Sequence, residues 1–134
     1  MSKDEAKQKI RELVEKYEKI KASGLISKYT EEETKKDFIL PLFRTLGWSV
    51  DDKNEVTAEE HQSSGRVDYG FYLNERLKFY LEAKSLKSDL NREDYANQAV
   101  KYSWNKGATW AILTDFENLK VFFESLHAKF HQID

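Results

Sequence analysis

Three residues in the middle of the chain have the side-chain types needed to bind a divalent cation and to orient a water molecule. Asp68 lies in a segment of alternating apolar and polar residues, and Glu82 and Lys84 lie in a second such segment. Residues two apart point to the same side of a strand, so Glu82 and Lys84 converge on one spot if their segment is a strand.

The strand context distinguishes this Glu-x-Lys pair from two others in the sequence. The same spacing occurs at 5–7 and 33–35, but both pairs lie in segments with helical periodicity. Positions two apart on a helix diverge by about 200° and do not converge. Asp68 precedes the pair across a two-residue turn expected at Asn74 and Glu75, and alternation places it on the face opposite the apolar residues of its strand. We therefore expect two carboxylates and one ammonium group at one site.

Such a set of groups suits metal-assisted hydrolysis of a phosphate ester. Paired carboxylates supply hard oxygen ligands for Mg²⁺ and leave coordination positions for water and a phosphate oxygen. The ion polarises the phosphorus centre and lowers the pKa of bound water, and a nearby ammonium can orient that water. The alternative is a cross-strand ion pair between Asp68 and Lys84 on a solvated sheet face, worth a few tenths of a kcal/mol.

Two helices are expected before these strands. Apolar residues recur every three or four positions over 4–22, and a Ser-Gly pair then ends the first helix. A second helix over about 30–46 opens with Thr30 and Glu33, which have the capping-box spacing. Pro41 lies inside this helix, so we expect a kink there.

The remaining elements complete an α/β pattern. Strands are expected near Val56 and over 67–73, 76–84, 110–114 and 119–123, with a helix over 91–106. This helix joins 76–84 to 110–114, so those two strands should run parallel. The predicted order is α-α-β-β-β-α-β-β, a mixed central sheet flanked by helices. No element is assigned to the tail beyond the last strand.

Composition excludes several classes of protein. The 134 residues fit one domain, with an N-terminal helix over 4–22 and a core over about 30–125. There is no cysteine, which excludes disulfides, thiolate zinc sites and cysteine nucleophiles. No apolar run approaches the ~18 residues of a membrane span, so we expect no membrane association and a cytoplasmic location. Twenty-two Lys and Arg against 24 Asp and Glu give a charge of −2, which argues against coating nucleic acid by charge alone.

Five segments in this order resemble a known family. They are residues 29–48 (YTEEETKKDFILPLFRTLGW), 65–71 (GRVDYGF), 81–84 (LEAK), 98–102 (QAVKY) and 110–115 (WAILTD). Together they resemble the N-terminal endonuclease domain of type IIG restriction-modification enzymes and the N-terminal nuclease domain of type I restriction R subunits. Both belong to the PD-(D/E)xK nuclease superfamily. The resemblance covers nearly the whole chain and implies a restriction-endonuclease-like core and a prokaryotic cytoplasm.

The resemblance also implies roles for individual residues. Asp68 and Glu82 resemble the metal ligands of the superfamily, and Lys84 resembles the lysine that positions the attacking water. Val67 stands where the family name has Pro.

A glutamate early in the second helix completes the family site, and Glu31 is its match. Helical periodicity does not choose between Glu31 and Glu32, and a glutamate in a first turn also stabilises the helix dipole without touching a metal. Gln98 and Tyr102 resemble a Gln-x-x-x-Tyr motif that assists DNA contact and site geometry; the alternative is a half-buried tyrosine beside a polar residue. Cations near the site could contact phosphates or simply form a solvated face, and they are Arg66, Lys87 and Lys101.

The strand geometry and the resemblance together predict an Mg²⁺-dependent DNA endonuclease, with Mn²⁺ able to substitute, that serves as the cleavage domain of a restriction-modification system. The sequence has no phosphate-binding loop and no methyl-donor motif, so methyltransferase, motor or target-recognition partners would lie outside it. Double-strand cutting would call for a homodimer. One alternative is a non-catalytic DNA-binding or protein-docking module of the same fold. Another is a nuclease that acts on junctions, single strands or RNA.

Overall fold

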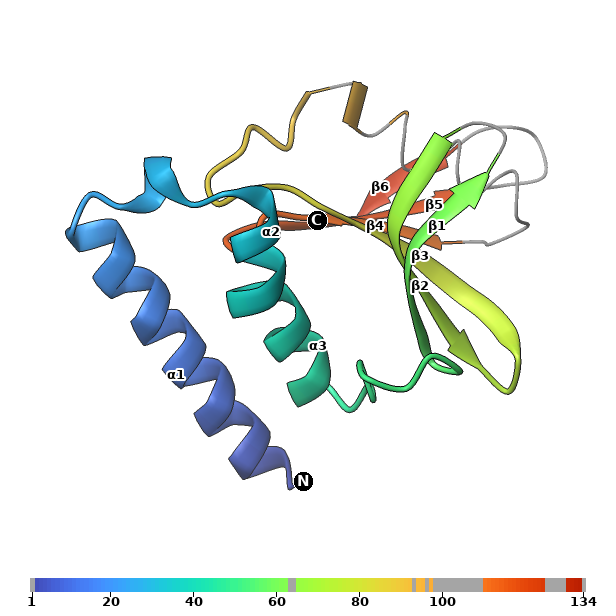
Figure 1. Ribbon diagram of the computed structural model, residues 1–134, viewed down its shortest axis with the longest axis horizontal. Coiled ribbons are helices and arrows are strands. Elements are labelled where there is room, and N and C mark those ends of the chain that lie inside the picture. The colour runs from blue at the N-terminus through green and yellow to red at the C-terminus, as the bar shows by residue number, and fades with distance from the viewer. Residues whose placement is uncertain are drawn as a thin grey trace.

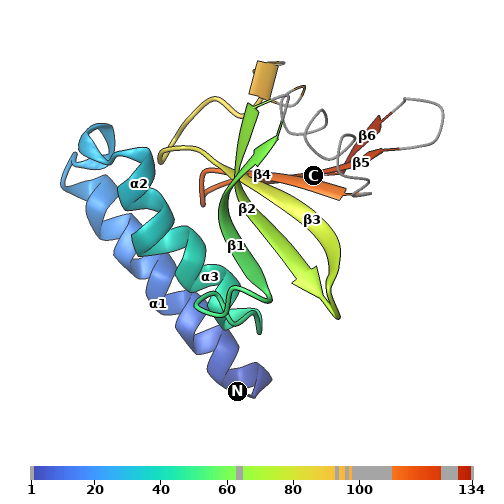
Figure 2. The same cartoon turned by 45° about the vertical axis from the view of Figure 1, so that its right-hand side comes forward.

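The computed structural model of the protein describes residues 2–62, 65–92, 94–95, 97, 110–124 and 130–133. Two helical elements lie side by side next to one twisted sheet, with the second element between the first and the sheet (Figure 1). The view turned by 45° shows the same layering (Figure 2).

Helix α1 (Lys3–Ala22) confirms the first predicted helix. The Oγ of Ser2 caps it by accepting a hydrogen bond from the Glu5 backbone N–H at 3.1 Å. Its inner face carries Tyr17, whose ring meets Phe38 of the second helical element edge-on at 6.2 Å. Among the described residues, neither α1 nor any other helix is long and apolar enough to cross a membrane.

A 3₁₀ turn, η1 (Ile26–Lys28), leads to the second helical element, which is continuous but not uniform. It consists of α2 (Glu31–Thr34), a π-helical turn η2 (Lys35–Ile39) and α3 (Leu40–Thr45). The predicted capping box is confirmed, because the Thr30 hydroxyl accepts from the N–H of Glu33 and the Glu33 carboxylate accepts from the N–H of Thr30.

A kink was predicted at Pro41, and the structure has a π-helical turn that ends at Ile39, two residues before this proline. Proline has no N–H, so the carbonyl of Asp37, four residues earlier, lacks its α-helical donor. The ammonium of Lys16 on α1 lies 3.5 Å from that carbonyl oxygen and supplies a replacement donor. The proline therefore also gives α1 a polar contact with the second helical element.

Within the described residues, six strands form one sheet in chain order. They are β1 (Val56–Gln62), β2 (Gly65–Leu73), β3 (Arg76–Ala83), β4 (Trp110–Thr114), β5 (Leu119–Glu124) and β6 (Phe130–Ile133). Strands β3 and β4 pair in parallel, and every other neighbouring pair is antiparallel. The predicted mixed sheet and α/β class are confirmed.

Two strands differ from the sequence-based expectation. Strand β1 pairs with β2 from Val56 to Gln62, although its polar residues predicted only a short strand. Strand β6 pairs with β5 in the tail, where no element was assigned. Most of the helix expected over 91–106 lies outside the described residues, but Asp94 and Tyr95 have helical backbone.

The turn between β2 and β3 confirms the predicted hairpin. Asn74 and Glu75 both have positive φ, at 52° and 66°, as a two-residue turn with the twist of the sheet requires. The register shifts within the hairpin: Phe71 pairs with Phe79, but Tyr72 pairs with Leu77. One residue of β3 is left without a partner, and beyond it the alternation changes face.

This shift corrects the expected grouping of apolar residues. Unbroken alternation over 76–84 would place Leu77 on one core face with Phe79 and Leu81. It packs instead with Tyr80 and Val67 in a separate small cluster.

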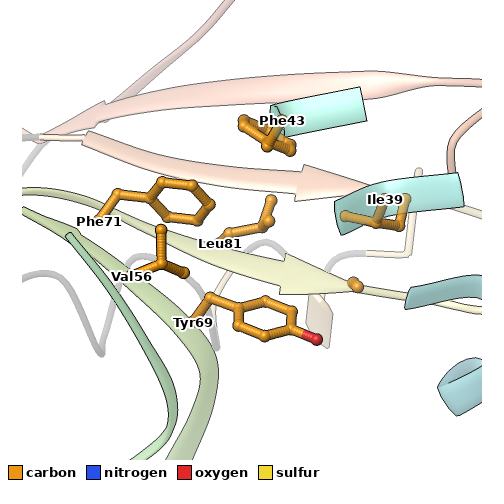
Figure 3. Close-up of a cluster of buried hydrophobic side chains, with 7 residues drawn as sticks. Ile39, Phe43, Val56, Tyr69, Phe71 and Leu81 are labelled. Carbon is orange, nitrogen blue, oxygen red and sulfur yellow. The ribbon is translucent and has the colours of Figure 1, made fainter. Parts of the chain in front are cut away.

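The main core joins the second helical element to the sheet. Ile39 and Phe43 from the helical element lie over the side chains of Tyr69, Phe71 and Leu81 (Figure 3). All five residues are less than 9% exposed, and apolar burial of this extent is the main source of stability in such a layer. The packing also fixes α2 relative to β2 and β3, the two strands that carry the candidate site.

Candidate active site

The register of β2 and β3 brings the two predicted carboxylates together. Tyr69 pairs with Leu81, so Asp68 lies opposite Glu82. The N–H of Asp68 donates to Oε1 of Glu82 at 3.3 Å, and the N–H of Ala83 donates to Oδ2 of Asp68 at 2.7 Å. Each acid is only 6% exposed. Neighbouring backbone therefore holds both carboxylates in a largely dry environment.

This burial contradicts the alternative of a solvated ion pair between Asp68 and Lys84. The ion-pair partner of Asp68 is Lys35, whose Nζ lies 2.7 Å from Oδ1. The Nζ of Lys84 lies 3.7 Å from Oε2 of Glu82, and these two side chains are 14% and 8% exposed. The site is thus a buried charge cluster at the junction of the helix and the sheet.

Lys35 is a site residue that the sequence analysis did not identify. Besides Asp68, its ammonium contacts Oε1 of Glu32 at 3.0 Å and Oε1 of Glu31 at 3.8 Å. The residue is 4% exposed. A glutamate and a lysine four apart on a helix usually form an exposed pair, which conceals the role of Lys35. One signal could have revealed it: Lys35 falls in the apolar stripe of its helix, three residues before Phe38.

The structure distinguishes Glu31 from Glu32, which periodicity could not do. The side chain of Glu32 is 77% exposed, whereas that of Glu31 is 44% exposed. Burial and the nearby Asp68 carboxylate raise the pKa of Glu31, while the cations Lys84 and Lys35 act in the opposite direction. Glu31 therefore faces the charge cluster and Glu32 lies at its solvent edge.

Glu82 is the most perturbed acid of the cluster. Burial is the first cause, the Asp68 carboxylate is the second, and together they raise the pKa of Glu82 to about 8. The Lys84 ammonium opposes this effect only in part. A carboxyl group with such a pKa is largely protonated at neutral pH in the absence of a further cation.

The charge balance of the site fits a divalent cation. Four carboxylates, those of Glu31, Glu32, Asp68 and Glu82, face only two ammonium groups. Within the part of the chain that the structure describes, no group of three or more acidic or histidine side chains is arranged to hold a metal ion, and the assignment of Asp68, Glu82 and Glu31 as metal ligands stays a prediction. The adjacent pair of Asp68 and Glu82 remains, and Mg²⁺ commonly binds through one or two carboxylates with water and phosphate oxygens.

Lys84 is held on two sides at the end of β3. Its Nζ lies 4.4 Å from the centre of the Tyr95 ring, in addition to its contact with Glu82. The Arg92 guanidinium lies 4.7 Å from the centre of the same ring. The backbone N–H of Lys84 donates to the carbonyl of Thr114 at 2.8 Å, which continues the β3–β4 pairing. Tyr95 thus orients the ammonium group that was predicted to position water, a role that no pattern in the sequence indicates.

The other predicted residues lie less clearly at the site. Lys87 is exposed in the loop after β3, with φ of 59°. The backbone of Arg66 is in β2, opposite His61. Gln98, Lys101 and Tyr102 lie outside the described residues. Roles in DNA contact stay predictions for all five.

The chain resembles restriction enzymes in both sequence and fold. No family model matches it. It is 26% identical over 130 residues to the type II restriction enzyme and methyltransferase RM.Eco57I of Escherichia coli, a match that covers 87% of this chain and 13% of that protein. Its fold matches a fragment of a protein assigned as the HsdR subunit of a type I restriction enzyme from Vibrio vulnificus YJ016, with a TM-score of 0.58 and 18% identity. That match covers 77% of this chain and 22% of the other.

These matches confirm the resemblance to restriction enzymes predicted from the sequence, and the structural match confirms a restriction-enzyme-like α/β fold. The chain spans 13% of the length of the curated relative and 22% of the solved chain. The relatives are therefore much longer proteins.

Proposed function

We propose that this chain is the cleavage domain of a restriction-modification system and hydrolyses DNA phosphodiesters with Mg²⁺, for which Mn²⁺ can substitute. The observation that carries the proposal is the buried carboxylate pair of Asp68 and Glu82 with Lys84 beside it. The similarity to two restriction enzymes supports the same proposal. The rest of such a system, including target recognition and methylation, would belong to other domains or subunits.

In this proposal each residue of the cluster has a distinct task. Asp68 and Glu82 hold the metal ion, which when bound polarises the phosphate and lowers the pKa of a water molecule. Lys84 orients the attacking water and stabilises negative charge that develops on the phosphate. Glu31 supports the site from the helix, and Gln98 keeps its predicted supporting role.

The raised pKa of Glu82 makes metal binding depend on pH. Glu82 must lose its proton before its carboxylate can act as a ligand, because a protonated acid is a poor ligand for a hard cation. Metal binding near neutral pH should therefore release a proton, and metal affinity should rise with pH toward about 8.

Plasmid cleavage tests the proposal directly. Wild type is assayed with Mg²⁺ and with EDTA, beside Asp68→Asn and Lys84→Met. Matched controls are Asp51→Asn and Lys78→Met, which alter exposed residues of the same charge. We expect the two site variants to cut at least about 100-fold more slowly while folded, as loss of a metal ligand or of a transition-state contact commonly causes. Cutting that persists in EDTA, or normal cutting by both site variants, would reject the assignment.

A non-catalytic module of the same fold is the second candidate, and one observation favours it. The ammonium of Lys35 lies 2.7 Å from Asp68, so this carboxylate has a counter-charge within the chain itself. A purely structural cluster of this kind would not respond to Mg²⁺ or Mn²⁺, whereas a metal site should raise the melting temperature on titration. The same cleavage assay, repeated on single strands, junctions and RNA, identifies the substrate. Sedimentation in the presence of DNA tests whether two copies assemble for double-strand cutting.

A further inference from the structure

Asp68 has no carboxylate oxygen free of a close donor. Oδ2 accepts the backbone N–H of Ala83 at 2.7 Å, and Oδ1 lies 2.7 Å from the ammonium of Lys35. The Ala83 amide is part of β3 and cannot move without disturbing the sheet. Oδ1, in contrast, is held by a side chain that can move, so it is the oxygen that is more easily opened to a cation.

From these contacts we propose that Lys35 is an internal counter-cation, which holds Asp68 in the metal-free protein and gives up that contact when a divalent ion binds. The inference rests on the proposed metal site. An Mg²⁺ ion lies about 2.0 to 2.1 Å from its oxygen ligands, and two positive charges on one oxygen repel each other strongly in a buried site. Lys35 and the metal ion therefore compete for Asp68.

Two other carboxylates on the same helix can pair with the Lys35 ammonium when it leaves Asp68. Glu32 lies 3.0 Å from its ammonium and has a side chain that is 77% exposed, and Glu31 lies 3.8 Å away. After leaving Asp68 the ammonium keeps both of these partners on its own helix, so its charge does not become unpaired. Lys35 is also the first residue of the π-helical turn, a local irregularity that is often found at functional sites.

A purely structural role for Lys35 predicts the opposite result. If Lys35 only held Asp68 in position, its removal would disorder the carboxylate and weaken metal binding. If it competes with the metal ion, its removal leaves the carboxylates with Lys84 as their remaining ammonium group, and metal binding becomes tighter. The sign of the change in affinity therefore separates the two roles.

Calorimetric titration of Mg²⁺ and of Mn²⁺ into the whole chain, without DNA, measures this sign. We expect Lys35→Met to bind at least about tenfold more tightly than wild type, because one competing charge is gone. Lys36→Met, which removes the exposed lysine next to it, should bind within about twofold of wild type because exposed charges are screened. Affinity in Lys35→Met that is equal to or weaker than wild type overturns the proposal, while loss of binding in Asp68→Asn would still support the metal site.

Absence of binding in both wild type and folded Lys35→Met overturns the metal site and the Lys35 proposal with it. Should Lys35→Met fail to fold, wild type with ¹⁵N-labelled lysine provides a second test. The ammonium signal of Lys35, assigned with Lys35→Gln or by through-bond correlation, should shift on titration with Mg²⁺ while that of Lys36 stays constant. A Lys35 signal that does not change at saturating Mg²⁺ overturns the proposal.

Discussion

Glu82 shows how a single buried acid controls the pH response of the metal-free protein. Its pKa rises from an ordinary 4.5 to about 8 in the folded chain, so the folded state binds this proton more tightly than the unfolded state. The contribution of Glu82 to the free energy of unfolding is therefore fully present below pH 4.5 and is lost as the pH rises from 4.5 to about 8. We expect the free energy of unfolding in EDTA to fall by roughly 2 to 4 kcal/mol between these two pH values.

Urea denaturation at pH 5 and pH 8, in EDTA, measures the change. Glu82→Gln should show a much smaller loss of stability, whereas Glu12→Gln on the exposed face of α1 should behave as wild type. Some loss of stability between pH 5 and pH 8 should persist in Glu82→Gln, because burial also raises the pKa of Glu31 and of Asp115. If Glu82→Gln loses as much stability between pH 5 and pH 8 as wild type does, Glu82 is not the acid that titrates in this range.

Tyr95 carries a second prediction at the level of single residues. Its ring contacts the Lys84 ammonium, an interaction of about 0.5 to 2 kcal/mol. Tyr95→Leu should therefore lower kcat for DNA cleavage by roughly 3- to 30-fold with little change in KM, since Lys84 loses its orientation. Tyr95→Phe keeps the ring and should cut nearly as fast as wild type. If Phe impairs cleavage as much as Leu does, the hydroxyl group and its contact with Arg92 are responsible instead.

The site residues divide into those that sequence could predict and those that it could not. Alternation in two strands predicted that Asp68 and Glu82 share a face, and the register confirms it. Lys35 was missed because its contact with Asp68 spans 33 residues and crosses from helix to sheet. Its local pattern shows only an ordinary helix pair with Glu31. Long-range contacts of this kind depend on tertiary packing, which one sequence does not reveal.

Among the elements, α2 is the one whose position matters most to the site. It carries both Glu31 and Lys35, and its first turn depends on the Thr30 cap, in which Oγ1 accepts the N–H of Glu33 at 3.1 Å. Thr30→Ala should cost about 1 kcal/mol of stability and should also slow DNA cleavage, because the frayed turn releases Glu31 and Lys35.

Helix α1 supplies a matched control for this prediction. Ser2 caps it with the same 3.1 Å bond to the N–H of Glu5, but far along the chain from the site residues. Ser2→Ala should lose no more stability than Thr30→Ala and should leave the cleavage rate unchanged. Urea denaturation and plasmid cleavage on both variants measure the two effects. Equal loss of cleavage in both variants would show that general instability, and not the position of α2, is responsible.

The strands show which sequence signals are strong enough to define an element. The β2–β3 hairpin has clear alternation on both arms, and its turn was located without a glycine. Strand β1 was underestimated because polar and small residues hide its alternation, so only backbone pairing with β2 defines it. The register shift after Phe71 was invisible, because an extra residue in a bulge leaves the local pattern of polar and apolar residues intact. For this reason Leu77 packs with Tyr80 and Val67 and not with the apolar residues that alternation would assign to its face.

At the level of the whole molecule, the layers place the charge cluster between the second helical element and the sheet. The helical element is held against the sheet by Ile39 and Phe43 on one side, and α1 covers it on the other through Tyr17 (Figure 2). This arrangement stabilises the site, but the net charge of the chain, −2, gives no general attraction to the phosphates of DNA. Nonspecific DNA affinity depends mainly on cations that neutralise phosphates, so it should be weak here.

Delivery to DNA by another domain should therefore limit the rate of cleavage. The matched relatives are much longer than this chain, which spans 13% and 22% of their lengths. We expect a fusion to an unrelated sequence-specific DNA-binding domain to cut at least about tenfold faster than the isolated chain, because a flexible linker raises the local concentration of DNA toward the millimolar range. Cuts should cluster within linker reach of the bound site, as mapped by sequencing the cleaved ends. The same fusion carrying Asp68→Asn, and a plasmid without the binding site, are the controls. Equal rates for fused and isolated chains would show that the domain binds DNA well enough by itself.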